Sequence, residues 1–218
     1  MKVERQSHRY AHRQGGFSLV ELVIVIAVGL ILAAMAIPAA MNMIHMFRLR
    51  NACSQFSSLV QQGRSRAVRD STYYTVRYVS STPITQAYVD VNKNSALDAA
   101  CSGTTDCDPQ VSWAPEVKPE AATNAPSTSA LQSAWLPTTT GVTVDDGNTS
   151  STSITFSPMG LPCVVNSTTS TCNTASSSTF TAYWMFFENT VTGQWEAVTV
   201  TPAGKVQKWA YSGSWSKL

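Results

Sequence analysis

The chain has 218 residues, enough for one globular domain and a modest appendage, which excludes a large multidomain enzyme. Only 13% of the residues are charged and 44% are hydrophobic, with the apolar residues concentrated near the N-terminus. Four of the 15 basic side chains lie within residues 1–16, and beyond residue 80 acidic groups outnumber basic ones. This charge distribution disfavours a protein whose whole surface binds nucleic acid.

The distribution of histidine excludes several kinds of catalytic site. His8, His12 and His45 are the three histidines, so residues 46–218 contain none. A Ser-His-Asp site, a Cys-His site or a histidine-based zinc site therefore cannot be assembled in the distal part of the chain. We expect no enzyme activity, no cofactor and no catalytic metal, and a membrane-tethered enzyme is the least favoured alternative.

The N-terminal segment combines a basic leader with an apolar run. From Leu22 to Met41 twenty residues carry no charge, long enough as a helix to cross a hydrocarbon core of about 30 Å. The positive-inside rule places residues 1–16 in the cytoplasm and the chain after about His45 outside. A secretory signal peptide is the alternative, since the alanines between residues 33 and 40 are small enough for its cleavage site.

Glu21, at the start of the apolar run, argues against the signal peptide. A carboxylate in this place is unfavourable unless it is neutralised or paired. Cleavage between Gly16 and Phe17 creates an α-amino group four residues before Glu21. The same amine on a neighbouring subunit is able to pair with the carboxylate inside a bilayer or a fibre core.

The sequence Gly-Phe-Ser-Leu-Val-Glu at residues 16–21, the basic leader before it and Pro38 inside the apolar run resemble the type IV pilin and pseudopilin family. The resemblance implies that a prepilin peptidase cuts after Gly16 and N-methylates Phe17. It assigns Glu21 to pairing with a terminal amine during assembly, and the apolar run to the membrane anchor and fibre core. Pro38 should bend or loosen the helix, because it removes one backbone donor.

The rest of the chain predicts an α+β fold, with a long N-terminal helix packed against the antiparallel sheets of a small globular domain. Apolar residues from Leu49 to Ala67 recur at helical spacing, which extends the helix over 17–71, with 17–41 as the transmembrane part. Residues 72–218 form the predicted globular domain, in which 115–137 and 166–178 are expected loops. The expected strands are 73–80, 84–91, 111–113, 142–144, 153–157, 179–188, 194–201 and 204–209.

Within the family, residues 48–78 look most like the minor pilin FimT and the minor pseudopilin GspH. The stretches Phe156–Gly160 and Val198–Val206 add to the resemblance. It implies a low-copy structural and assembly subunit, held in the inner membrane by one span with its C-terminal domain in the periplasm. The implied partners are prepilin peptidase and other pilins or pseudopilins. A pilus and a type II secretion system remain equally open, because both use the same leader, helix and body.

A second hypothesis is DNA capture in natural transformation, which some FimT-like pilins perform through a Gly-Arg-x-Arg element near the C-terminus. The corresponding stretch here, residues 204–208, has lysine in place of the first arginine and glutamine in place of the second. Lys205, Lys208 and Lys217 are the candidate phosphate contacts, and Trp209 is the candidate for base stacking. An edge strand with its aromatic residues packed on the sheet is the favoured alternative.

The cysteines fit an oxidising compartment. Cys101 with Cys107 and Cys163 with Cys172 are close pairs beside polar loops, so two local disulfides are the simplest arrangement. Cys53 is left over, and its place on the apolar helical face favours a buried free thiol over an intermolecular bridge.

Residues 90–98 carry oxygen-bearing side chains at alternating positions, as a calcium loop does. The candidate ligands are Asp90, Asn92, Asn94 and Asp98, with Asp106 or Asp108 to complete the shell. However, Ser95 stands at the position of the usual glycine and Cys101 at that of the usual glutamate. A structural hairpin loop is therefore favoured over a calcium site.

Overall fold

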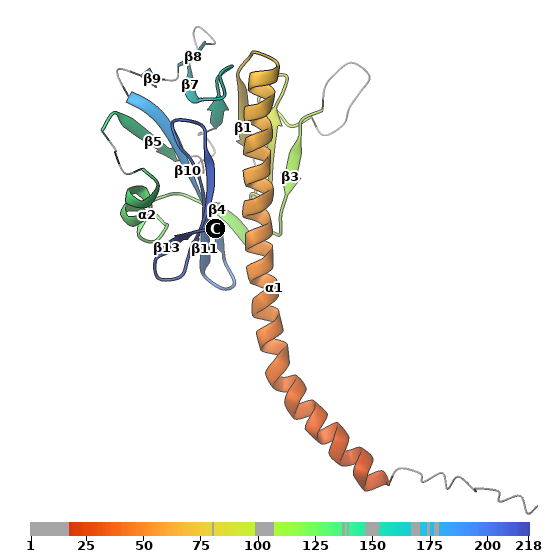
Figure 1. The fold of residues 1–218 in the computed structure, drawn as a ribbon. Coiled ribbons are helices and arrows are strands. Elements are labelled where there is room, and N and C mark those ends of the chain that lie inside the picture. Colours follow the sequence, from red (N-terminus) through yellow and green to blue (C-terminus); the bar gives the residue numbers. More distant parts are fainter. Residues whose placement is uncertain are drawn as a thin grey trace, which may run out of the picture. The chain divides into compact units, whose positions relative to one another are not determined.

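The computed structural model describes residues 18–79, 81–98, 107–136, 138, 140–146, 153–166, 171–173, 175–176 and 179–218. Within these residues a long helix, α1 (Leu19–Arg69), precedes a body of two β-sheets and one short helix (Figure 1). The chain divides into two compact units, Met1–Met41 and Asn42–Leu218, and α1 runs from the first into the second.

Helix α1 has two stretches of different character. Every residue from Leu19 to Met41 is exposed, although most of these side chains are large and apolar. From Leu49 onward one face is buried, and its positions advance by three or four residues, as expected for an amphipathic helix. Among the described residues α1 is the one helix that is long and apolar enough to cross a membrane by length and composition.

The first sheet has the strand order β3-β2-β1-β6-β7-β8, and all its described pairs are antiparallel. The strands are β1 (Tyr74–Tyr78), β2 (Gln86–Asp90), β3 (Gln110–Ser112), β6 (Ile154–Phe156), β7 (Pro162–Asn166) and β8 (Thr171–Asn173). Alternation along β1 gives its two faces different roles. Tyr74 and Val76 join the core formed with α1, whereas Thr75 and Arg77 line a polar cavity.

The second sheet has the order β13-β12-β11-β10-β4, and two further strands, β5 and β9, also pair with β10. Its strands are β4 (Val117–Glu120), β5 (Val142–Asp146), β9 (Ala175–Ser176), β10 (Thr179–Asn189), β11 (Gln194–Val200), β12 (Val206–Tyr211) and β13 (Trp215–Lys217). The pairing of β5 with β10 is parallel, an exception within an otherwise antiparallel arrangement.

Two hydrophobic clusters hold the body together. In the first, the buried face of α1 packs against residues of both sheets, and four aromatic rings from different parts of the chain meet there. Phe56 of α1 stacks on Tyr78 at 5.3 Å between centroids. Trp113 contacts both of these rings, and Phe187 contacts Phe56 and Trp113. In the second, helix α2 (Thr128–Trp135) covers the opposite face of the second sheet.

The expectation of an exposed loop over 115–137 is wrong. This stretch contains β4, which pairs with β10, and α2, which buries Leu131 and Trp135 against the second sheet. Two apolar residues are enough to dock a helix of two turns when a sheet face is already present. The expected loop over 166–178 is also wrong in part, because β8 and β9 lie within it. Strands β7 and β13 were not expected either, and β7 begins at a proline, a residue that the strand pattern disfavours.

Candidate functional site

The N-terminal part of the candidate assembly site lies at the beginning of α1. Gly16 and Phe17, the predicted processing residues, lie outside the described residues. Glu21 stands in the first turn of α1, where a carboxylate interacts favourably with the free backbone N–H groups of the helix. Pro38 lies inside the same helix. The roles of these four residues in processing, assembly and bending stay predictions.

Arg64 connects α1 to two turns of the body. Its Nε donates a hydrogen bond of 2.9 Å to the carbonyl oxygen of Gly160, and its outer nitrogen lies 3.5 Å from the carbonyl oxygen of Ala203. Both Gly160 and Gly204 adopt positive φ angles, which glycine tolerates best. The two distal stretches that carried the family resemblance therefore meet at one helical arginine, a contact that sequence reasoning missed.

A second connection lies at the opposite end of the buried part of α1. Glu116, just before β4, accepts a hydrogen bond of 2.7 Å from Arg48 and lies 2.8 Å from Nδ1 of His45. The amide of Asn189 donates to the backbone carbonyl of His45 at 3.0 Å. Burial works to raise the pKa of Glu116, but hydrogen bonds from His45 and Arg48 prevail and lower it.

Cys53 is a free thiol that is fully buried between α1 and the second sheet. Glu196 of β11 lies beside it, only 3% exposed, with Arg50 Nε 3.6 Å from one carboxylate oxygen. Burial raises the pKa of the Cys53 thiol well above its ordinary value, and the charge of Glu196 raises it further. Because the thiolate is the reactive form, Cys53 should be inert in the folded chain.

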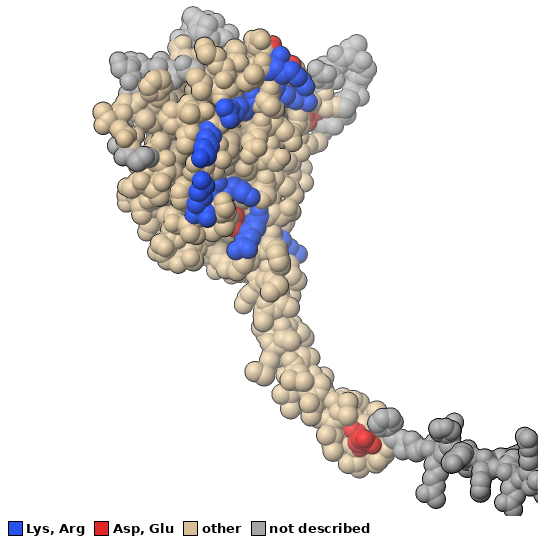
Figure 2. All heavy atoms as spheres, viewed as in Figure 1, with Lys and Arg blue, Asp and Glu red and all other residues tan. Residues whose placement is uncertain are grey.

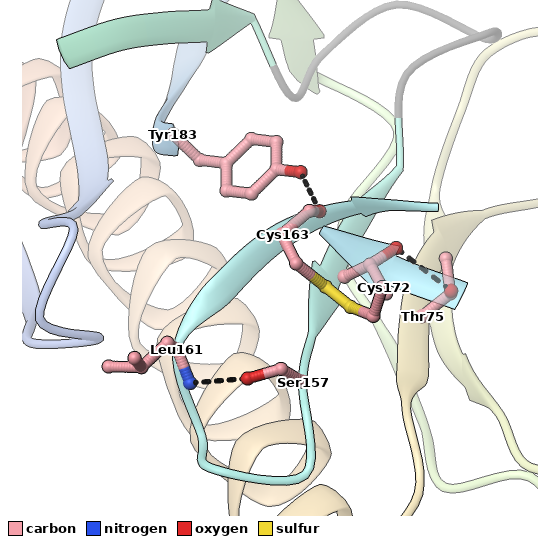
Figure 3. The surroundings of a disulfide bond; sticks show 7 residues. Thr75, Ser157, Leu161, Cys163, Cys172 and Tyr183 are labelled. Atoms are coloured by element: carbon pink, nitrogen blue, oxygen red, sulfur yellow. Dashed lines mark hydrogen bonds between the residues drawn. A yellow bond between two sulfur atoms is a disulfide. The ribbon is translucent and has the colours of Figure 1, made fainter. Parts of the chain in front are cut away.

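Cys163 and Cys172 form a disulfide that joins β7 to β8, with their Cα atoms 5.5 Å apart (Figure 3). The hydroxyl of Tyr183, from β10, donates a hydrogen bond of 2.8 Å to the carbonyl oxygen of Cys163, so the bridge is also tied to the second sheet. Cys107 is disulfide-bonded as well, and its predicted partner Cys101 lies outside the described residues.

The predicted calcium positions are linked by hydrogen bonds within the loop itself. Asp90 accepts from the backbone N–H of Ser95, and the amides of Asn92 and Asn94 both donate to the carboxylate of Asp98. In the described part of the chain no group of three or more His, Cys, Asp or Glu side chains is placed to hold a metal. These bonds favour the structural loop that the sequence predicted, and calcium binding stays the untested alternative.

Basic side chains gather along one face of the body, where α1 lies beside β12. We call Arg50, Arg64, Lys205 and Lys208 the cationic row. The ammonium of Lys208 donates to the hydroxyl of Ser54 on α1 at 2.8 Å, and Arg64 and Lys205 line one groove of about 570 Å³. Figure 2 shows a line of Lys and Arg side chains on this face with few acidic ones between them.

The other predicted nucleic-acid contacts do not form one surface. Trp209 is only 5% exposed and its indole N–H donates to the hydroxyl of Thr199 at 3.0 Å, so its ring is unavailable for base stacking. This agrees with the favoured alternative of an aromatic residue packed on the sheet. Lys217 is exposed on β13, opposite Trp209 in the strand register.

Comparison with known proteins finds a match at the N-terminus of the chain. Residues 11–37 match the model of the prokaryotic N-terminal methylation motif. The N-terminal part of the chain therefore carries a prepilin-type methylation motif. The chain is also similar to the type IV minor pilin FimU of Pseudomonas aeruginosa strain PAO1, with 11% identity, 77% of this chain and 92% of that chain covered, and a TM-score of 0.42. No curated protein sequence matches the chain.

The signature implies processing by a prepilin peptidase and assembly with other pilins. Among the described residues, α1 carries an exposed apolar stretch and is long and apolar enough to cross a membrane by length and composition. The FimT or GspH subtype stays a prediction.

Proposed function

We propose that the chain is a minor pilin or pseudopilin, a low-copy subunit that is stored in the inner membrane and then incorporated into a type IV pilus or a type II secretion pseudopilus. One observation carries the proposal. The methylation motif leads directly into a helix whose stretch from Leu19 to Met41 is entirely exposed and mostly apolar. An apolar surface of this length requires lipid or neighbouring helices to cover it.

The position of Glu21 makes processing a condition for assembly. Its carboxylate is unfavourable in an apolar surrounding until a cation pairs with it. The cation of suitable reach, the α-amino group of Phe17, exists only after the leader has been removed. A processed subunit therefore offers both an amine and a carboxylate, and neighbouring subunits are able to pair them reciprocally. The body would then be presented on the periplasmic side, where the Cys163–Cys172 disulfide is stable.

The proposal is tested by following the cleavage of the leader. Co-expression with a prepilin peptidase should yield a membrane protein that begins at N-methylated Phe17, as determined by intact-mass analysis. Gly16→Leu should block the cut, because the site before the scissile bond accepts only a minimal side chain, while Gly15→Leu, one residue earlier, should be processed normally. A mature chain that begins after Ala36 or Ala40 and is recovered as soluble protein would overturn the proposal.

The cationic row favours a second candidate function, capture of DNA during natural transformation. A row of four basic groups along α1 and β12 matches a linear polyanion better than a compact ligand. Binding of labelled double-stranded DNA should weaken in Lys205→Ala/Lys208→Ala, and the slope of log Kd against log salt should fall by about 2. Lys118→Ala, on β4, is the matched control. Equal salt slopes for the double variant and the parent chain would exclude these two lysines as phosphate contacts.

A further inference from the structure

The hairpin that joins β10 to β11, residues 189–194, is fastened to α1 at His45. The side-chain amide of Asn189, which is fully buried, donates a hydrogen bond of 3.0 Å to the carbonyl oxygen of His45. Thr190 is held as well, since its backbone N–H and its hydroxyl both donate to the carbonyl oxygen of Glu116. The hairpin therefore has a fixed position beside His45.

We call residues 190–193 the hairpin tip. No residue from 189 to 194 is charged, and Val191 in the tip is 61% exposed. The backbone N–H groups of the tip all have partners within the chain. That of Thr190 donates to the carbonyl oxygen of Glu116, those of Val191 and Thr192 to the side-chain oxygen of Asn189, and that of Gly193 to the backbone oxygen of Asn189.

The bonding of these N–H groups bears on the surroundings of the tip. An N–H group in an exposed turn is able to bond to water, so a turn in solution does not need an internal partner for each one. A turn that enters lipid does need them, because water is scarce there and an unpaired N–H group is costly. The hairpin tip thus combines an exposed apolar side chain with a backbone whose donors are already satisfied.

The place of His45 in α1 relates the hairpin tip to a bilayer. His45 follows Met41, the last residue of the apolar stretch, by four residues of the same helix, which is about 6 Å along the helix axis. The headgroup layer is about 5–7 Å thick on each side of the hydrocarbon core. Exposed apolar side chains continue at this level of the helix, where Ile44 is 44% and Phe47 59% exposed. A membrane that covers α1 up to Met41 therefore has its headgroups near His45.

The charged groups beside the hairpin are compatible with a headgroup layer. The carboxylate of Glu116 is paired with Arg48 and with His45, so it does not stand alone. Arg48 is itself half-exposed and offers a cation to lipid phosphates. Glu188, the carboxylate just before the hairpin, lies opposite Lys118 in the strand register. The surroundings of the tip therefore contain balanced charges and a free cationic surface, which suits a phospholipid better than a hydrocarbon alone.

We propose that the hairpin tip inserts into the headgroup region of the lipid bilayer, so that the body makes a second contact with the membrane before the subunit is assembled. Val191 is the inserted side chain, and Asn189 is the positioning residue that holds the tip. The inference rests on the membrane anchor of the proposed function. A single apolar side chain is too weak to bind a soluble protein to a membrane, but the anchor keeps the tip beside the lipid at a high effective concentration.

The first test uses the full-length chain in vesicles of phosphatidylethanolamine and phosphatidylglycerol, with a nitrobenzoxadiazole fluorophore on Val191→Cys. Cys53 is buried, and the parent chain serves as the labelling blank. Nitroxides on the lipid should quench the fluorophore, and iodide in the water should quench it at least twofold less than in Ala203→Cys. Ala203, the control, is exposed in the turn between β11 and β12. Its carbonyl oxygen lies near Arg64, about 28 Å beyond His45 along α1.

A second test needs no label on the tip. A phospholipid that carries a diazirine beside its headgroup should photolabel residues 189–194 of the parent chain, as located by mass spectrometry. Val191→Asp should reduce this labelling at least threefold, because a carboxylate opposes entry into lipid. Ala203→Asp introduces the same charge at the opposite end of β11 and should leave the labelling unchanged.

Flotation of the vesicles separates failure of the anchor from failure of the hairpin contact. A chain that floats with the vesicles but shows equal iodide quenching at positions 191 and 203 keeps the anchor and overturns the hairpin contact. A chain that does not float overturns the anchor and the contact together. Position 191 shielded from iodide without quenching by the lipid nitroxides also overturns the proposal, because a protein neighbour then covers the tip.

Discussion

Gly204 lies so close to Gly160 that a Cβ atom added to Gly204 would stand 2.5 Å from the Gly160 carbonyl oxygen. The same added atom would be 2.9 Å from Nε of Arg64, which donates a hydrogen bond to that oxygen. Backbone and arginine therefore fill the space that any side chain at position 204 would need. Close packing of Gly204 against Gly160 and Arg64 holds the turn between β11 and β12 against α1.

Gly204→Ala should destabilise the body more than its backbone conformation alone explains. An alanine at a φ of +77° costs about 1–2 kcal/mol, and the contact with Gly160 adds to this cost because a main-chain oxygen cannot rotate away. Gly213→Ala is the matched control, since Gly213 has a φ of +84° but nothing within 4 Å of its added Cβ. Urea unfolding measures the loss in free energy of unfolding for both variants, and equal losses would show that the contact with Gly160 adds no cost.

The pH dependence of stability should reveal the contact of Glu116 with His45 and Arg48. The pKa of Glu116 is lower in the folded chain than in the unfolded one, so the ionised contact stabilises the fold above the ordinary value of 4.5. This contribution is lost as the pH falls through the lowered pKa. The stability gap between the parent chain and Glu116→Gln, measured by urea unfolding, should therefore shrink below about pH 4.5.

Glu188 on β10 provides a control of opposite sign. Burial raises its pKa, and the nearby Glu120 raises it further, so the folded chain favours the protonated form. The cost of ionised Glu188 is relieved by acid, and the parent chain should gain stability relative to Glu188→Gln as the pH falls. If the stability difference from the parent chain changed in the same direction with pH for Glu116→Gln and Glu188→Gln, the opposite pKa shifts of the two carboxyl groups would be contradicted.

Cys53 should resist thiol reagents until the body unfolds. Its side chain is fully buried and its thiol pKa is raised by burial and by Glu196, so little thiolate is present at neutral pH. Labelling with a maleimide in detergent should be negligible in the native chain and complete in denaturant. On non-reducing gels, assembled fibres should contain no dimer that is linked through Cys53, so the parent chain and Cys53→Ala should give the same bands. Such a dimer would favour the intermolecular bridge instead.

Glu21→Ala should leave membrane insertion intact and reduce incorporation into the fibre. The apolar residues from Leu22 to Met41 still provide the anchor, whereas the partner for the terminal amine is lost. Fractionation of membranes and sheared fibres gives both quantities in one experiment. Glu21→Gln has nearly the shape of glutamate without the charge and tests whether pairing depends on ionisation. Normal incorporation of both variants would remove Glu21 from the assembly step.

The sequence is most informative where function depends on local pattern. The apolar run, Glu21 and the helical spacing after Leu49 predicted α1, because each signal lies within a few residues of the feature that it specifies. The short helix α2 was not predicted, because the burial of Leu131 and Trp135 depends on a sheet face that is formed by residues distant in sequence. The polar cavity lined by Thr75 and Arg77 was missed for the same reason: its wall is assembled from separate strands by their register.

The four aromatic rings in the first cluster have a consequence for the order of folding. Phe56 comes from α1, Tyr78 from β1, Trp113 from the segment after β3, and Phe187 from β10. Contacts between residues so distant in sequence form late, because closing the intervening chain into a loop costs conformational entropy. Part of the apolar face of α1 therefore stays uncovered until β10 has been synthesised. The interval between synthesis of α1 and completion of this core is when the chain is most open to proteolysis and aggregation.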